Sequence, residues 1–174
     1  IKLCMTEFAE SIYEISTGQT VPHNLAGVLT TADFYVRNAR DVSMDTAIFH
    51  AMNSSDWITA WHNNGQWGLT GIGMLQNMMK KYAIGNVVDS TLTGYSAGVA
   101  ADVVGMAVKP DENTTNLIFV NAGDSQAEVT FDLGSDYLLA EESVLKSTKD
   151  TPAKTLNPTA KFIRNILPDE NNSP

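Results

Sequence analysis

The pattern of apolar and polar positions changes once along the chain, near Gly85. Before this point, short apolar runs alternate with longer segments in which apolar residues recur at helical spacing. After it, apolar and polar residues alternate with a period of two, which is typical of strands that bury one face. The pattern therefore predicts a β-α-β-α half followed by an all-β half.

The first half contains two short apolar runs and two helical segments. The runs Lys2–Phe8 and Asp45–Met52 suit interior strands of a parallel sheet, and helices are expected over residues 23–40 and in a segment that Gly85 closes. Strands that alternate with helices imply parallel pairing with the helices packed outside. Two parallel strands leave open edges and an uncovered face, so we expect further strands from the same longer protein or from another chain.

The second half predicts antiparallel strands. The clearest alternation is AEVTFDL, residues 127–133, which with the preceding TNLIFV indicates a hairpin around a turn at Asn121–Ser125. Further strand candidates are Val103–Val108, Tyr137–Ala140 and Lys161–Leu167. Their spacing predicts an antiparallel β-sandwich over residues 87–167, and the polar tail 168–174 is expected to be disordered.

Charge and cysteine content narrow the classes of partner. Among the 174 residues, 20 acidic and 11 basic side chains give a net charge of −9, which argues against nucleic acid and anionic membrane as partners. Neutral polymers such as polysaccharides remain open. The single cysteine, Cys4, excludes an intrachain disulfide and a cysteine-based zinc site, and no metal or cofactor is expected. The chain begins at Ile1 inside an apolar run, and we expect it to be part of a longer protein.

Several of these segments occur together in one known context. The chain has a strand that ends in Thr-Glu-Phe, a helix LAGVLTTADFYVRNAR, a strand AIFHAMN, an aromatic loop, a last helix and then the expected sandwich. In this order they resemble the C-terminal part of retaining glycoside hydrolases with a (β/α)8 barrel, most nearly the α-L-arabinofuranosidase group (family 51) and its relatives. The resemblance implies that residues 1–86 are the last two βα units of the barrel, with Lys2–Phe8 as strand seven and Asp45–Met52 as strand eight, and that residues 87–167 are an accessory sandwich.

The resemblance also implies a catalytic role for Glu7, as the nucleophile at the C-terminal end of strand seven. Retaining glycosidases use two carboxyl groups about 5–5.5 Å apart, and barrel active sites lie at the C-terminal strand ends. In the family the acid/base is a Glu at the end of strand four, which lies outside this chain. A solvated or ion-paired residue at a strand end is the alternative for Glu7, and Glu10 is the neighbouring competitor.

Candidate sugar contacts follow the second strand. His50 ends that strand, where a barrel residue would face the pocket, although a core histidine bonded to backbone is an equal alternative. Asn53 comes next, and then a loop that contains all three tryptophans, among them Trp57 and Trp61. Flat aromatic faces stack on the C–H faces of sugars, although tryptophans also pack loops onto a domain. Trp61 is the first choice for a sugar contact.

Three triplets match the acceptor pattern for N-glycosylation, and the candidates are Asn53 and Asn113, because Pro174 follows the third triplet, at Asn171. They favour a secreted or extracellular location.

The sequence therefore predicts the C-terminal part of a secreted glycoside hydrolase that cleaves glycosidic bonds of polysaccharides or oligosaccharides by a retaining mechanism. The alternative is a non-catalytic extracellular protein that retains the glycosidase fold for structural purposes or for carbohydrate binding. An Asn-Glu pair that ends a strand about 100 residues upstream of Ile1 would favour the enzyme.

The strand register in the second half can be tested at Phe131, which lies between Val129 and Leu133 on the expected buried face. Replacement of a buried phenylalanine by alanine leaves a cavity, so Phe131→Ala should lower the free energy of unfolding by about 3–5 kcal/mol. Urea denaturation measures this change. A loss below about 1 kcal/mol would place Phe131 outside the core and reject the register.

Overall fold

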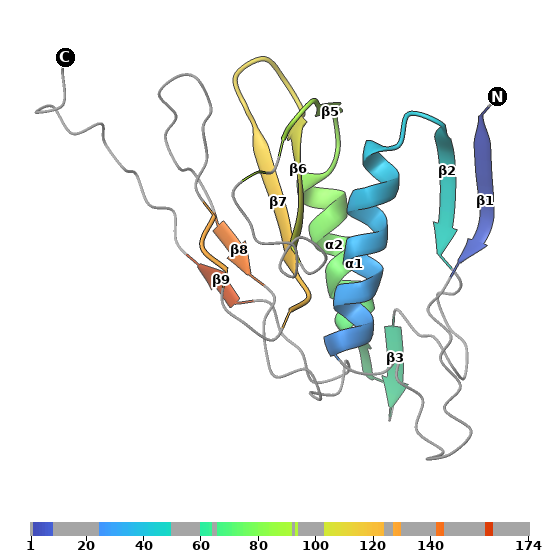
Figure 1. Cartoon of the computed structure of the whole chain (residues 1–174). Coiled ribbons are helices and arrows are strands. Elements are labelled where there is room, and N and C mark those ends of the chain that lie inside the picture. Colours follow the sequence, from blue (N-terminus) through green and yellow to red (C-terminus); the bar gives the residue numbers. More distant parts are fainter. Residues whose placement is uncertain are drawn as a thin grey trace, which may run out of the picture.

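The computed structural model describes residues 2–8, 25–49, 60–63, 66–91, 93, 103–123, 127–129, 142–144 and 159–161 (Figure 1). Within them the order of elements is β1 (Leu3–Phe8), α1 (Leu25–Arg40), β2 (Met44–Phe49), β3 (Ala60–Asn63), β4 (Gln66–Leu69), α2 (Gly71–Tyr82), β5 (Asn86–Val88), β6 (Val103–Lys109), β7 (Asn116–Asn121), β8 (Glu142–Val144) and β9 (Thr159–Lys161).

The first three elements form a β-α-β unit. Strands β1 and β2 pair in parallel, as the sequence predicts, and α1 connects them. The helix begins at Leu25, two residues after the predicted start, and ends at Arg40 as predicted. Its last turn carries Arg37 and Arg40, whose positive charges favour the negative end of the helix dipole.

A tight turn at Asp41 connects α1 to β2. The backbone N–H and the hydroxyl of Ser43 donate hydrogen bonds to Asp41 Oδ1, at 2.8 and 2.7 Å. These bonds stabilise the ionised carboxylate, so the pKa of Asp41 lies below its ordinary value. The carbonyl of Ser43 in turn accepts the N–H of Leu3 at 2.8 Å. The turn that ends α1 therefore also starts the parallel pair.

The largest sheet in the described part of the chain has three antiparallel strands in the order β5-β6-β7. The strand prediction for Val103–Val108 is confirmed by β6, and β7 matches the apolar run before Asn121. In the described part of the chain β7 pairs with β6. The predicted second strand of the hairpin is wrong at its start, since residues 127–129 lie in no strand.

Several strand predictions fall on residues outside the described ranges. They are residues 130–133, Tyr137–Ala140 and most of Lys161–Leu167, and the tail 168–174 lies outside as well. Strands β8 and β9 pair antiparallel with each other, and β9 shares Lys161 with the predicted strand. The closed barrel and the two-sheet sandwich stay predictions.

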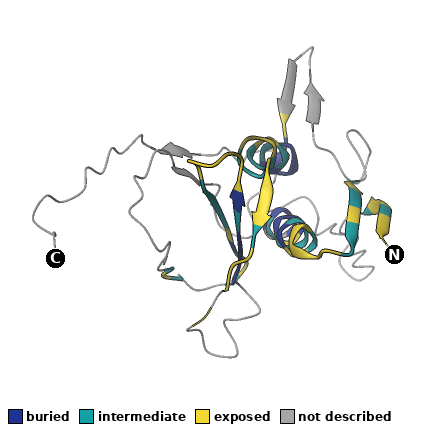
Figure 2. Cartoon of the chain, turned by 90° about the horizontal axis from the view of Figure 1, so that it is seen from above, coloured by how far each residue is buried: buried dark blue, intermediate teal, exposed yellow. Residues whose placement is uncertain are grey.

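The two helices lie between the three-stranded sheet on one side and the β1-β2 pair on the other (Figures 1 and 2). One face of α1 carries buried apolar residues three or four positions apart, which is the spacing of a single helical face. This face packs into one cluster with α2 and the inner face of the sheet. The cluster contains Leu25, Val28, Ala32, Val36, Ile72, Leu75, Val104, Met106, Val108 and Val120. The core thus draws residues from both sides of the expected boundary after residue 86.

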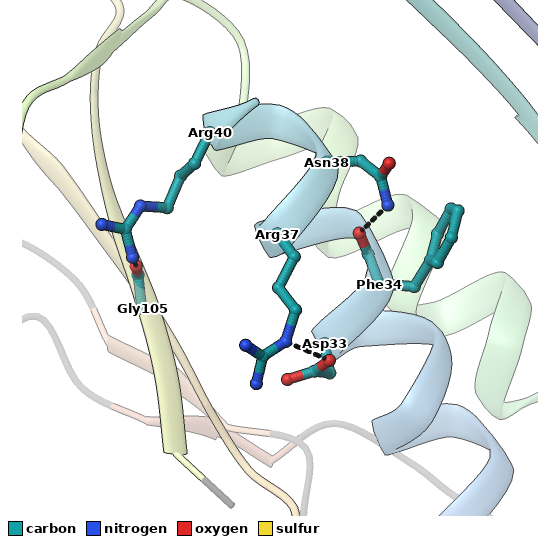
Figure 3. A network of polar contacts seen from close by, with 6 residues as sticks. All are labelled: Asp33, Phe34, Arg37, Asn38, Arg40 and Gly105. Carbon is teal, nitrogen blue, oxygen red and sulfur yellow. Dashed lines mark hydrogen bonds and ion pairs between the residues drawn. The ribbon is translucent and has the colours of Figure 1, made fainter. Parts of the chain in front are cut away.

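Polar contacts add to the packing between α1 and the sheet (Figure 3). The guanidinium of Arg40 donates hydrogen bonds to the carbonyl of Gly105 in β6 at 3.1 Å and to the carbonyl of Ser90 at 3.0 Å. Gly105 has no room for a side chain, because a Cβ there would lie 2.5 Å from Cε1 of Phe119 on β7. Arg40 thus ties the end of α1 to the central strand β6 through one carbonyl and to the segment after β5 through another.

Gly85 lies where the chain leaves α2 for β5, and its φ of +131° is unfavourable for other residues. A Cβ at this position would collide with the Lys109 carbonyl oxygen and with the Cα of Pro110. Both obstacles are backbone atoms and cannot rotate away. The sequence expectation that Gly85 follows the end of the helix agrees with this geometry, since α2 ends at Tyr82 with Ala83 as its C-cap.

Gly85→Ala should therefore lower the free energy of unfolding by at least about 2 kcal/mol, from backbone strain and the collision together. Thermal or urea unfolding checks this value. The adjacent Ile84 is 62% exposed and provides the control, because Ile84→Ala should change stability by about 0.5 kcal/mol or less. Equal effects of the two substitutions would contradict the role of Gly85.

Candidate active site

Glu7 lies at the C-terminal end of β1, one residue before the strand ends at Phe8. Its side chain is exposed. In parallel β/α folds the carboxyl ends of the strands are where side chains from several elements converge on a ligand. The position of Glu7 at a strand end is thus confirmed, and its catalytic role stays a prediction.

The pairing of β1 with β2 is irregular at Glu7. Met5 lies opposite Ala47 and Phe8 lies opposite Phe49, so three steps along β1 correspond to two along β2. The extra residue falls at Thr6 and Glu7, which together oppose the single residue Ile48. This arrangement is a β-bulge, a feature that is common next to active sites because it redirects a side chain.

Burial shows which way the side chains on either side of the bulge point. Met5, Phe8, Ala47 and Phe49 are half-buried, whereas Thr6, Glu7 and Ile48 are exposed. Phe8 contacts rings of α1, so the half-buried set faces the helix. Because neighbouring strand residues point to opposite faces, Glu7 and Ile48 lie on the face away from α1.

The face of β1 and β2 away from α1 exposes an apolar side chain that a complete parallel sheet would bury. Ile48 is 52% exposed, although strands of a parallel sheet are normally buried on both faces. In a closed barrel, the face away from the helices is the interior, and its rim is where catalytic side chains gather. Glu7 therefore lies on the face and at the end where a barrel would place a reacting group.

Part of the predicted aromatic loop is a β-hairpin, which corrects the loop prediction. Strands β3 and β4 pair antiparallel with Trp61 opposite Gly68 and His62 opposite Trp67. Asn64 and Gly65 lie between them in the sequence, and an Asn-Gly pair is the strongest short-range signal for a two-residue hairpin. The Asn-Gly pair is therefore the sequence signal from which this hairpin can be predicted, although the segment is polar overall.

The hairpin leads directly into α2. Thr70 follows β4, is buried, and caps the helix by accepting the Gly73 N–H on its hydroxyl at 3.2 Å. Figure 1 shows β3 at the end of the molecule toward which β1 and β2 point. The structure thus brings Glu7 and the strand that carries Trp61 to the same end of the fold.

The remaining predicted site residues divide into two groups. His50, Asn53 and Trp57 lie outside the described residues. Asn113, the second glycosylation candidate, is exposed in the connection between β6 and β7, where its N–H donates to Asp111 Oδ1 at 2.8 Å. This bond, together with bonds from Thr114, lowers the pKa of Asp111.

Other types of site find no support in the described part of the chain. Among residues with a defined position, no group of three His, Cys, Asp or Glu side chains could hold a metal ion. Neither α1 nor α2 is long and apolar enough to cross a membrane. The chemistry that the candidate site offers is that of one carboxylate on an open face, which is half of the pair that a glycosidase needs.

None of the protein-family models, curated proteins or solved structures compared with the chain matches it.

Proposed function

We propose that this chain is the C-terminal part of a secreted, retaining glycoside hydrolase in which Glu7 is the nucleophile. Its substrates are polysaccharides or oligosaccharides, and the acid/base residue comes from the part of the protein that carries the other barrel strands. The observation that carries the proposal is the bulge at the end of β1, which places Glu7 on the open face of a parallel strand pair.

The proposed reaction has two steps. The Glu7 carboxylate attacks the anomeric carbon and forms a covalent glycosyl ester, while the acid/base residue donates a proton to the departing oxygen. Water then attacks the same carbon, the acid/base residue takes its proton, and the carboxylate of Glu7 is released. Each step needs both carboxyl groups, about 5–5.5 Å apart.

Other features support a carbohydrate ligand at the same end of the fold. The hairpin that carries Trp61 lies at the end to which β1 and β2 point (Figure 1). Tryptophan provides a flat apolar face for a sugar ring with a polar edge that stays hydrated. In the proposal, Trp61 and Trp57 stack on sugar rings, and His50 and Asn53, which follow β2, hydrogen-bond their hydroxyl groups.

The architecture that goes with this function is a closed parallel barrel followed by a sandwich. The exposed apolar residue Ile48 would be covered by the side chains of the other barrel strands. The β5-β6-β7 sheet would be one of the two sheets of the sandwich, with one face packed on α1 and α2 and the opposite face, which exposes Phe119, covered by the second sheet.

Glu7→Gln tests the function in the complete native protein. Glutamine keeps the shape of the side chain but cannot form the glycosyl ester, so the hydrolysis rate should fall by about three orders of magnitude or more. Folding and oligosaccharide binding should change little, because Glu7 is exposed and outside the core. Steady-state hydrolysis assays and calorimetric binding measure the two effects. The matched control is Glu10→Gln, which should keep the native rate.

A mechanism-based fluoroglycoside gives an independent measurement. It should attach to Glu7 and leave Glu10 unlabelled, as peptide mass spectrometry can show. Full activity of the Glu7→Gln variant would reject the assignment. A native protein that binds oligosaccharides without hydrolysing them would instead support the non-catalytic alternative.

A further inference from the structure

Phe8, the residue after Glu7, is held by aromatic rings from two elements. Its ring stacks on Phe34 of α1 with the centroids 4.3 Å apart and the planes at 28°. It also meets Tyr35 of α1 and Phe49 of β2 edge to face, each at a centroid distance of 5.5 Å. These are favourable geometries for aromatic pairs. Three rings therefore surround the side chain next to the candidate nucleophile.

The aromatic cluster is itself anchored in the core. The hydroxyl of Tyr35 accepts a hydrogen bond from Nε2 of Gln76 on α2 at 3.3 Å, and burial raises the pKa of this phenol. Tyr35 and Phe49 also pack against the main apolar cluster. The position of Phe8 is thus set by α1, which in turn is set by α2 and the sheet.

The bulge makes this anchor important for Glu7. At a bulge the regular ladder of hydrogen bonds is interrupted, so the ladder alone does not define the direction of the inserted residues. Beyond Glu7, the recorded pairing of β1 with β2 consists of Phe8 opposite Phe49. The backbone on the C-terminal side of Glu7 is therefore fixed by that pair and by the contacts of the Phe8 ring with α1.

We propose that Phe8 is a positioning residue, whose contacts with Phe34, Tyr35 and Phe49 hold the bulge so that the Glu7 carboxylate points along the line of attack. This inference rests on the proposed function of Glu7 and adds the element that orients it. Phe8 acts through the backbone and does not touch the sugar. A displacement of about 1 Å in a reacting group can cost about a hundredfold in rate, so a loosened bulge has a measurable effect on chemistry.

The test measures the labelling of Glu7 by a fluoroglycoside in the complete native protein and in two variants. Phe8→Leu and Phe34→Leu keep an apolar side chain but remove one ring of the stacked pair. Each should lower the first-order rate constant of labelling by about ten- to a hundredfold, because the carboxylate is less well oriented. The dissociation constant of the reagent should change by less than about threefold, because the sugar-binding residues are unaltered. Phe34→Leu leaves the sequence of β1 unchanged, so it provides the same measurement if Phe8→Leu does not fold.

The matched control is Val103→Ala on β6. Val103 is buried but lies outside the apolar cluster that holds α1, so this variant loses stability without loosening the anchor of Phe8, and its rate constant of labelling should stay native. If the Phe variants label at the native rate, the positioning role of Phe8 is wrong while the proposed function stands. A rate loss in Val103→Ala equal to that of Phe8→Leu would also overturn the positioning role. If the native protein is not labelled at Glu7, both the function and this inference fail.

Discussion

Helix α1 is packed on two sides, and the placement of α2, the β5-β6-β7 sheet and the β1-β2 pair relative to one another depends on this double packing. One side carries buried residues such as Val28 and Val36 against α2 and the inner face of the sheet. The other side carries Phe34, which stacks on Phe8, and Tyr35 contacts both Phe8 and the apolar cluster, so α1 also holds the parallel strands. Burial of apolar area is the main force in both contacts. Because the helix is rigid, the position of β1 is coupled to the packing of a sheet that begins some 80 residues later in the sequence.

This coupling explains how a stable core can support an exposed strand pair. The face of β1 and β2 toward α1 is half-buried, whereas the opposite face exposes Ile48 and Glu7. A charged residue on that face carries no burial cost as the chain stands, and it would enter a barrel interior once further strands covered the face. The carboxylate is therefore located where packing demands are smallest and where, in a closed barrel, other strand ends converge. Such a location suits a functional residue better than a structural one.

The sequence predicts the elements of the first half well, because hydrophobic periodicity reports directly on packing. Both helices and the parallel strands follow from it, with α1 displaced by two residues at its start. The pairing of β7 could not be predicted with the same success, since alternation shows that a strand has one buried face and does not show its partner. The β3-β4 hairpin was predictable from Asn64 and Gly65.

The candidate site was accessible to sequence reasoning only in part. The chemistry of Glu7 was suggested by resemblance, because neither composition nor periodicity distinguishes a catalytic glutamate from a solvated one. The bulge leaves no mark in LCMTEF, which contains no glycine or proline, and it arises from how β1 pairs with β2. The proposed role of Phe8 could not be inferred from the sequence either, because its ring contacts Phe34, Tyr35 and Phe49, which are distant in sequence.

We propose that Glu7 is one member of a catalytic carboxyl pair in a closed parallel barrel. A crystal structure of the complete protein tests this through the distance from the carboxyl group of Glu7 to the nearest other carboxyl group. We expect about 5–5.5 Å, with β1 paired in parallel on both edges. A β1 strand with one edge open, or a Glu7 with no second carboxyl group within about 10 Å, would contradict it.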